Sequence, residues 1–291
     1  MTVAIVIASL GRPEALAELL EDLERQTRRA DRIVLSLTTP ADAPPNAGHC
    51  SNVDVITSPK GSCAQRNAAL DHLAGNADVI LFLDDDYVPS RFAVERAVRL
   101  IADHPDVAGA TGDLVADGIH GPGISVGEAR QLLTEYDSRP CPPIRPSHDL
   151  GGLYGCNMVF RGSAIRDIRF DERLPLYGWQ EDIDFAARAG RHGRIVKTFA
   201  FAGVHRGIKS GRSSGVRFGY SQVVNPVYLV RKGTMDQRYA RKIIVRNLVA
   251  NHIRALRPEA WVDRAGRLRG NWLGLFDLMR GQVRPERILH L

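Results

Sequence analysis

The chain has 291 residues and an ordinary globular composition, with 44% hydrophobic and 25% charged residues and a net charge of +6. This length is enough to bury a full core, and the balance argues against a disordered or low-complexity protein. No apolar run approaches the roughly 20 residues that are needed to cross a bilayer.

The charge is distributed unevenly along the chain. Residues 1–205 contain 21 Lys or Arg and 28 Asp or Glu, a net charge of −7, whereas residues 206–291 contain 18 and 5, a net charge of +13. This basic C-terminal third indicates an anionic partner. On charge alone that partner could be a membrane surface, a diphosphate or nucleic acid.

Strands and helices are predicted to alternate through the first hundred residues. Apolar runs predict strands at residues 3–8, 32–36, 53–56 and 79–83. Leucines at helical spacing follow Pro13, and a second helix opens at Gly61-Ser62. Short links between such elements predict an α/β fold with a doubly wound, mostly parallel sheet that is flanked by helices.

The pattern is less regular beyond residue 90. It predicts helices at 92–101, near 128–133 and at 181–189, strands at 107–112 and 153–160, and loop over much of 117–149. A flexible loop is predicted up to Gly219, followed by basic helices near 220–232, 236–256 and 271–280. We therefore divide the chain into residues 1–210 and a basic, mainly helical region over residues 211–291.

Cysteine usage and the first residues predict a cytosolic protein. The four cysteines, Cys50, Cys63, Cys141 and Cys156, have neither metal-binding nor redox spacing, so we expect reduced thiols. The apolar run at residues 3–8 is too short for a signal peptide, and Gly11-Arg12-Pro13 follows it in place of a cleavage site.

The most informative feature is a run of three acids, Asp84-Asp85-Asp86, that directly follows the apolar residues 79–83. A strand of this kind is buried on both faces, and open α/β sheets bind their ligands at the carboxyl ends of such strands. Adjacent carboxylates repel one another, and Mg²⁺ or Mn²⁺ would offset that repulsion and hold phosphate oxygens. The plainer alternative is a solvated acidic turn that caps a helix.

A second group lies at residues 179–184, where Trp179 precedes Glu181 and Asp182 at the predicted start of a helix. Acids in this position often do no more than complement the helix dipole. The functional interpretation makes Asp182 a general base and Trp179 an apolar platform for an acceptor.

Two further residues are candidates for the same site. His205 ends an apolar run, and it is either an ordinary core histidine or a ligand of an aspartate-bound ion such as Mn²⁺. Arg66 lies on the helix that opens at Gly61-Ser62, where it would either grip a diphosphate or pair with an aspartate of the triplet.

Taken in order, these residues resemble the family 2 glycosyltransferases of the GT-A fold. The matching pieces lie at residues 5–9, 12–13, 26–27, 61–67, 83–86, 179–182 and 205. The resemblance covers about residues 1–210, and it implies that this part is the catalytic domain that binds the nucleotide sugar and the acceptor.

The resemblance also implies roles for individual residues. It makes Asp182 the catalytic base, places the metal on Asp86 and His205, and assigns the acceptor to Trp179 and Glu181. The residues that it assigns to the nucleotide sugar are Ser9, Arg12, Arg66, Asp84 and Asp85. One departure concerns the nucleobase, because residues 35–39 read Leu-Ser-Leu-Thr-Thr where the family usually has an acidic motif. UDP, GDP and dTDP donors therefore all stay open.

The implied reaction is a metal-dependent displacement, with Mn²⁺ or Mg²⁺, that inverts the anomeric carbon of a nucleoside-diphosphate sugar. By family analogy it would build a bacterial surface glycan on a glycan or lipid-linked acceptor. An apolar stripe of Ile244, Leu248 and Val249, flanked by Lys242 and Arg246, would either lie on an anionic membrane or pack on the catalytic domain.

Two other classes of protein remain as alternatives. Residues 84–88 also fit the motif of haloacid-dehalogenase-like phosphotransferases, in which the first aspartate, here Asp84, is the nucleophile. In that family the motif usually lies on the first strand, whereas here three strands are predicted before it. The other alternative is a non-enzymatic protein that binds an anionic surface, either a membrane or nucleic acid. Nucleic acid is not expected as its partner, because the basic region lacks interleaved aromatic residues and a recognisable binding motif.

Overall fold

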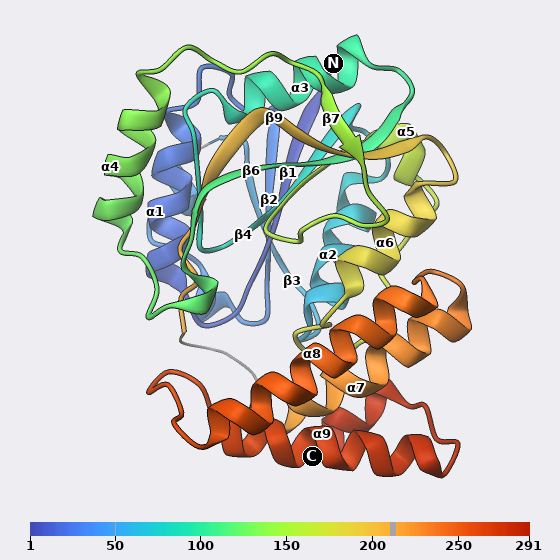
Figure 1. The fold of residues 1–291 in the computed structure, drawn as a ribbon. Helices are drawn as coiled ribbons and strands as arrows, with labels where there is room; N and C mark the ends of the chain where they lie inside the picture. Colours follow the sequence, from blue (N-terminus) through green and yellow to red (C-terminus); the bar gives the residue numbers. More distant parts are fainter. Residues whose placement is uncertain (50, 210–213) are drawn as a thin grey trace.

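The computed structural model describes residues 1–49, 51–209 and 214–291. Within these ranges one sheet of nine strands forms the centre of the molecule (Figure 1). In chain order its strands are β1 (Val3–Ser9), β2 (Arg32–Leu37), β3 (Val53–Thr57), β4 (Val79–Asp84), β5 (Tyr87–Pro89), β6 (Val107–Asp117), β7 (Pro146–Asp149), β8 (Asn157–Arg161) and β9 (Arg194–His205).

The order of the strands across the sheet is β3-β2-β1-β4-β8-β6-β9-β5, and β7 pairs with β9. The first four strands of this order are parallel, as the sequence predicts. The strand β8 runs antiparallel to both of its neighbours, β4 and β6, so the second half of the sheet is mixed. Whether a strand is parallel or antiparallel to its neighbour depends on the connection between the two strands. The spacing of apolar residues does not indicate that connection.

Helices cover both faces of the sheet. Alternate residues of β1 point to opposite faces, so Ile5 packs with α1 (Pro13–Glu24) and α3 (Ala93–Asp103). Its neighbour Val6 packs with α2 (Ser62–Leu73) and α6 (Glu181–Ala189). Two further helices, α4 (Val126–Asp137) and the short α5 (Gly162–Ile165), lie at the periphery. The predicted α/β class is confirmed by this arrangement.

Three helices follow the sheet and stack together beneath it: α7 (Gly215–Lys232), α8 (Gln237–Ala255) and α9 (Arg264–Met279) (Figure 1). Leu229, Ala240 and Ile243 belong to the same buried cluster as Phe185 of α6, so α7 and α8 share a core with the sheet domain. The carboxylate of Asp184, which is fully buried, accepts hydrogen bonds from Lys232 at 2.9 Å and from Thr234 at 2.8 Å. The inner face of the C-terminal helices therefore packs on the sheet domain.

Several boundaries differ from the predicted ones. The strand β8 begins at Asn157, four residues later than predicted, and β6 continues to Asp117. The twelve-residue β9 and the short β5 and β7 were not predicted as strands. Helix α7 begins at Gly215, inside the predicted loop, of which residues 210–213 lie outside the described ranges. Cys50 also lies outside them, while the other three cysteines are free thiols.

Among the helices of the described ranges, none combines the length and the apolar character that a membrane span requires.

Candidate active site at the carboxyl end of the sheet

The acidic triplet lies where β4 ends. Asp84 is its last residue, and Asp85 and Asp86 form the turn into β5. Asp85 and Asp86 are buried, whereas the side chain of Asp84 is 34% exposed. Ala8 of β1 pairs with Asp84, so the parallel register brings the end of β1 beside the triplet. Of the three carboxylates, that of Asp84 is therefore the most open to a ligand.

Asp85 holds the segment that follows β1. Its Oδ2 accepts a hydrogen bond from Ser9 Oγ at 2.6 Å, and its Oδ1 accepts one from Arg12 Nη1 at 2.8 Å. Burial raises the pKa of Asp85 to about 6, against the charge of Arg12 and the Ser9 hydroxyl. The structure thus brings together three residues that the sequence assigns to the nucleotide sugar, and it uses Asp85 to position the other two.

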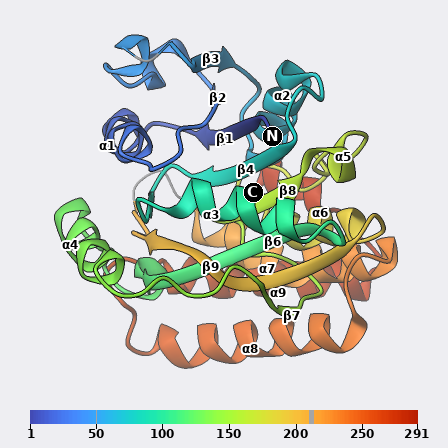
Figure 2. The same cartoon turned by 90° about the horizontal axis from the view of Figure 1, so that it is seen from above.

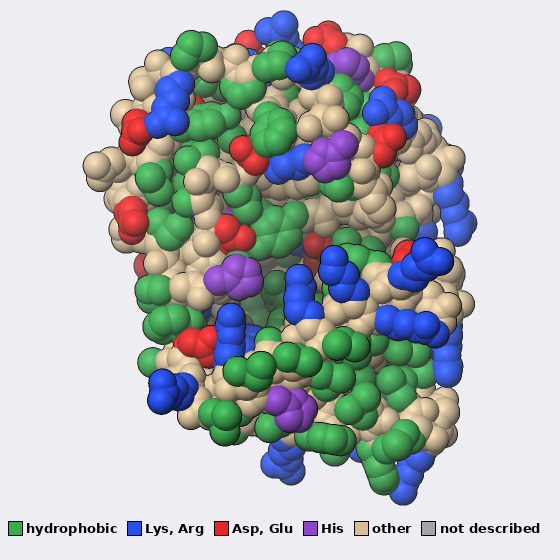
Figure 3. Space-filling view, in the orientation of Figure 1, with side chains coloured by type: hydrophobic (Ala, Val, Ile, Leu, Met, Phe, Trp, Pro, Cys, Tyr) green, Lys and Arg blue, Asp and Glu red, His purple; other side chains and the backbone are tan. Residues whose placement is uncertain are grey.

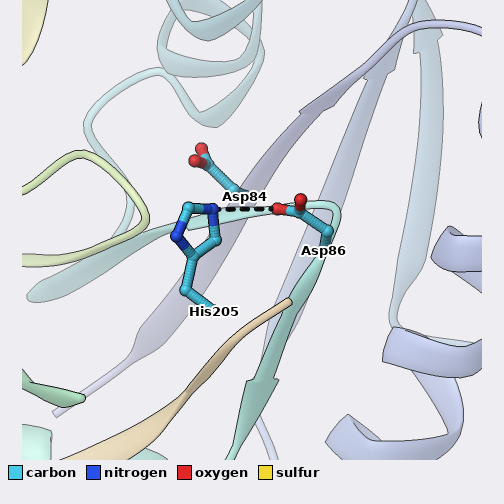
Figure 4. Close-up of side chains that lie close together, drawn as sticks. All are labelled: Asp84, Asp86 and His205. Carbon is cyan, nitrogen blue, oxygen red and sulfur yellow. Dashed lines mark ion pairs between the residues drawn. The ribbon is translucent and has the colours of Figure 1, made fainter. Parts of the chain in front are cut away.

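Asp86, in the turn between β4 and β5, and His205, at the end of β9, face one another although they are far apart in the sequence (Figure 4). His205 Nε2 lies 3.4 Å from Asp86 Oδ1, and Asp86 Oδ2 accepts a hydrogen bond from the Ile208 N–H at 2.8 Å. Burial alone would raise the pKa of Asp86, but the hydrogen bond and charge of His205, with Arg12 and the Ile208 N–H, lower it.

The other ring nitrogen of His205 has its own partner. Nδ1 lies 2.8 Å from Oδ1 of Asp117, at the end of β6, and Tyr154 donates its hydroxyl hydrogen to Asp117 Oδ2 at 3.0 Å. Burial lowers the pKa of His205, but the carboxylates of Asp117 and Asp86 outweigh it and raise that pKa to about 10. Asp117 therefore orients the ring so that Nε2 faces Asp86.

These residues fit a divalent cation. Asp84, Asp86 and His205 each offer one ligand atom, and the three atoms lie within 4.8 Å of one another. Carboxylate oxygens suit Mg²⁺ and Mn²⁺, and an added imidazole favours Mn²⁺. Metal-binding histidines commonly donate their second ring N–H to a carboxylate, as His205 can donate to Asp117.

The first testable prediction concerns Asp117. Replacing it with asparagine is expected to weaken Mn²⁺ binding by about 10–100-fold, because the imidazole loses the carboxylate that orients it and raises its basicity. Calorimetric titration with Mn²⁺ alone measures this directly. Asp113→Asn is the matched control, because Asp113 lies on the same strand and pairs with Lys197 at 3.2 Å. Equal Mn²⁺ affinity in both variants would show that Asp117 has no part in the metal site.

Arg66 connects the triplet to the second acidic group. It is buried on α2, where it donates from Nη2 to Asp84 Oδ1 at 3.0 Å and from Nη1 to Glu181 Oε1. Burial lowers the pKa of Arg66, but the carboxylates of Glu181 and Asp84 outweigh it and raise that pKa. Of the two interpretations from the sequence, pairing with the triplet is therefore observed. Glu181, assigned to the acceptor, is buried in this ion pair.

Asp182 lies beside this pair, at the start of α6. Its Oδ2 accepts a hydrogen bond from the Gly155 N–H at 2.9 Å, and its Oδ1 accepts one from the Ile183 N–H at 2.8 Å. Burial raises the pKa of Asp182 to about 6, although the two N–H groups and Arg66 oppose the shift. Asp182 is thus held in one orientation with its pKa raised toward neutrality, which suits a general base.

The segment before α6 has an unusual backbone. Leu176 and Gln180 have φ values of 60° and 76°, which residues with a Cβ seldom adopt, and they bracket Trp179. The Trp179 ring is half-buried against Phe218 of α7, and its carbonyl accepts a hydrogen bond from Asn225 at 2.9 Å. Backbone conformations of this kind persist where packing imposes them, commonly at functional sites.

Sequence reasoning missed several residues of the site. Asp117 and Tyr154 gave no signal, because the strand that ends at Asp117 was predicted to stop at residue 112. Gln65 lies in the helix that the sequence predicts from Gly61-Ser62, and its amide donates to the carbonyls of Ser9 and Ser36 at 2.7 and 2.8 Å. It thereby joins α2 to the ends of β1 and β2.

Another missed residue lies in the loop that follows β2, where the family's usual acidic motif is absent. Asp42 is buried there and accepts hydrogen bonds from the Gly11 N–H at 3.0 Å and from Thr38 Oγ1 at 2.9 Å. These bonds lower the pKa of Asp42 although burial alone would raise it. Both of its oxygens are used to hold the loops that follow β1 and β2.

Comparisons with known proteins agree with this geometry. A family profile described as "Glycosyl transferase family 2" matches residues 4–168. Among solved structures, TarS 1–349 of S. aureus is 13% identical with a TM-score of 0.57, covering 97% of this chain and 92% of that chain. The same protein in complex with UDP-GlcNAc is 14% identical with a TM-score of 0.53, covering 97% and 93%.

A third similar structure is the mannosyltransferase PcManGT from Pyrobaculum calidifontis in complex with GDP-Man and Mn²⁺. It is 14% identical with a TM-score of 0.50, covering 99% of this chain and 84% of that chain. Identities this low establish likeness of fold only. No curated protein sequence matches the chain. The family profile confirms the resemblance seen in the sequence, and these folds confirm the predicted GT-A type architecture.

Proposed function

The chain belongs to glycosyl transferase family 2, and from this premise we propose that it moves a sugar from a nucleoside-diphosphate donor to an acceptor hydroxyl, with inversion of the anomeric carbon. The observation that supports this most is the convergence of two groups at one end of the sheet. A three-residue ligand set for a cation, Asp84, Asp86 and His205, is linked through Arg66 to the helix start that carries Asp182.

In the proposed reaction Asp182 takes the proton of the acceptor hydroxyl as that oxygen attacks the anomeric carbon. The new carbon–oxygen bond forms on one face of the sugar while the bond to the diphosphate oxygen breaks on the other, so the configuration inverts. The Gly155 and Ile183 N–H groups hold the Asp182 carboxylate in place during this transfer. A positioned base of this kind contributes about 10²–10⁴ in rate.

Mn²⁺ or Mg²⁺, bound by Asp84, Asp86 and His205, would supply charge neutralisation for the departing nucleoside diphosphate. The chain's own residues prepare that end of the site. Asp117 holds the imidazole, while Asp85 holds Ser9 and Arg12 at the end of β1, beside the acidic triplet. Arg66 forms ion pairs with both Asp84 and Glu181.

The second prediction is a pH profile. Asp182 accepts a proton only when ionised, and its pKa is raised to about 6, so kcat/KM is expected to fall by about tenfold for each pH unit below about pH 6. Initial rates across the pH range give the profile. Asp85 also has a pKa of about 6. The Asp85→Asn variant should therefore show the same fall of kcat/KM at low pH, even if its absolute rate is lower. If kcat/KM of this variant no longer falls at low pH, the titrating group is Asp85 and not Asp182.

The donor is tested by thermal melting with UDP, GDP, dTDP and CMP, each with and without Mn²⁺. A nucleotide that binds only the folded protein raises its melting temperature, and more so at higher concentration. We expect one nucleoside diphosphate to raise it only in the presence of Mn²⁺. The relatives bind UDP-GlcNAc and GDP-Man, so both classes belong in the panel. No shift with any of the four would contradict the proposal.

For the cellular role we propose assembly of a bacterial surface glycan on a glycan or lipid-linked acceptor, in the cytoplasm. The free thiols of Cys63, Cys141 and Cys156 fit a reducing compartment. The phosphotransferase alternative loses its support, because Asp84 ends the fourth strand of a chain that belongs to another family.

A further inference from the structure

An exposed apolar surface covers the outer side of the C-terminal helices. Its members are Val245, Val249, Ile253 and Leu256 on α8 and its C-cap, with Trp272, Phe276 and Met279 on α9, and we call this set the α8–α9 apolar face. Met279 is 77% exposed and Leu256 is 84% exposed. The rings of His252 on α8 and Trp272 on α9 pack in a T-shaped arrangement with their centroids 5.8 Å apart, so the apolar residues of the two helices adjoin.

This surface differs from the stripe predicted from the sequence. Ile244 and Leu248 are half-buried, and only Val249 of the predicted stripe is on the exposed face. The spacing of Val245, Val249, Ile253 and Leu256 places them one turn apart along one side of α8. Figure 2 shows α8 as the outermost of the three helices, and in Figure 3 hydrophobic side chains gather over this part of the molecule.

The α8–α9 apolar face has a positive border. Helix α8 carries five Lys or Arg residues and no acid, and the single acid within α9, Asp277, is buried against Tyr220 and Arg287. The exposed basic residues on and between the two helices are Arg238, Arg241, Lys242, Arg246, Arg254, Arg257, Arg269 and Arg280. In Figure 3 Lys and Arg side chains stand along α8 and at the lower edge.

The face is preformed. Asn251 of α8 donates to Asn271 of α9 at 2.8 Å and to Gln222 of α7 at 2.9 Å, and all three side chains are buried. Arg264 adds a bond to Asn251 at 2.9 Å. These hydrogen bonds form a buried polar network that holds the three helices together. If α8 rotated to bury its exposed apolar residues, the polar groups of this network would be left unpaired, which is unfavourable.

Charge and shape select one occupant. A second copy of the chain would bring the same positive border against itself, and like charges oppose such a contact. Nucleic acid would leave the aliphatic side chains of α8 and Met279 without an apolar partner. An anionic bilayer matches both the apolar face and its positive border. The apolar side chains would enter the membrane interface, where Trp is favoured, and the Lys and Arg side chains would contact lipid phosphates.

We infer that the α8–α9 apolar face docks on the surface of an anionic lipid bilayer. The docking stands on the surface alone, but one consequence rests on the proposed function. Ala240 and Ile243 of α8 belong to the same buried cluster as Phe185 of α6, so α8 packs on the helix that carries the candidate base Asp182. A docked protein would therefore hold its acceptor side close to the lipid headgroups.

The test is co-sedimentation of the full chain with vesicles of phosphatidylcholine that contain about one third phosphatidylglycerol. We expect binding that weakens steeply with salt and falls more than about tenfold on pure phosphatidylcholine. Ile253→Glu and Trp272→Glu should each lower binding by more than about tenfold, since they replace apolar contact with charge. Lys242→Gln should lower it roughly fivefold.

Val55→Glu is the matched control, because Val55 is 43% exposed on the edge strand β3, which Figure 2 shows on the far side of the molecule from α8, and this variant should bind like the unmodified chain. Unmodified chain that stays in solution, or Glu variants that still sediment, would overturn the inference. The inference would also be overturned if light scattering showed that the unmodified chain is a dimer and that Ile253→Glu is a monomer, because the face would then bind a second copy of the chain. Nucleotide-dependent melting, measured on the same samples, reports the donor site separately and should not change.

Discussion

Asp182→Asn is expected to lower kcat by about 10²–10⁴ while the donor still binds, because the amide cannot accept the acceptor's proton. The side chain keeps its size, and its oxygen can still accept the Gly155 or the Ile183 N–H, so the start of α6 should hold its shape. Steady-state rates with the donor identified by melting give kcat. Nucleotide titration of the same variant gives the donor Kd.

The control for this change removes a carboxylate elsewhere. Asp113→Asn breaks an ion pair with Lys197 on β9 and should leave kcat within about twofold. If Asp182→Asn retains full kcat, proton transfer belongs to another group, and Glu181 is the nearest carboxylate on the same helix. If the variant loses donor affinity together with kcat, Asp182 maintains the structure of the donor site and is not the base that accepts the proton.

Asp86→Ala is expected to abolish the Mn²⁺-dependent part of nucleotide binding and to lower kcat/KM by at least about a hundredfold, since a bound cation is worth several kcal/mol to such a transition state. Asp86 contributes one of the three ligand atoms that lie within 4.8 Å of one another. Calorimetry with Mn²⁺ alone and melting with nucleotide plus Mn²⁺ measure the loss without reference to activity.

Asp86 also accepts the Ile208 N–H, so its removal costs some stability. His205→Gln provides a second test from another strand, because it removes the imidazole ligand and leaves Asp86 in place. Both variants should lose Mn²⁺ binding if the cluster is the metal site. Undiminished Mn²⁺ affinity in both folded variants would place the cation elsewhere and remove the metal from the proposed function.

Local patterns in the sequence predicted the elements that carry the chemistry. Residues 79–83 are apolar because β4 is buried on both faces, and the change to three acids marks the edge of the sheet. The Glu181-Asp182 pair marked the start of α6 in the same way. The strand β9 was not predicted, because Lys197 and Thr198 divide its apolar residues into two short runs, so neither alternation nor one continuous run marks its full length.

What the sequence alone determined is the position of each acidic group at the end of a strand or helix, the family, and the basic character of the last third. Only the tertiary structure decided which side chains meet. Asp85 with Ser9, Arg66 with Glu181, and His205 with Asp117 join residues separated by 76, 115 and 88 positions. Periodicity reports whether a residue faces a core, but partners this distant depend on strand order and register. For the same reason packing against α7 and α9, and not the apolar spacing of α8, decided which of its residues stay exposed.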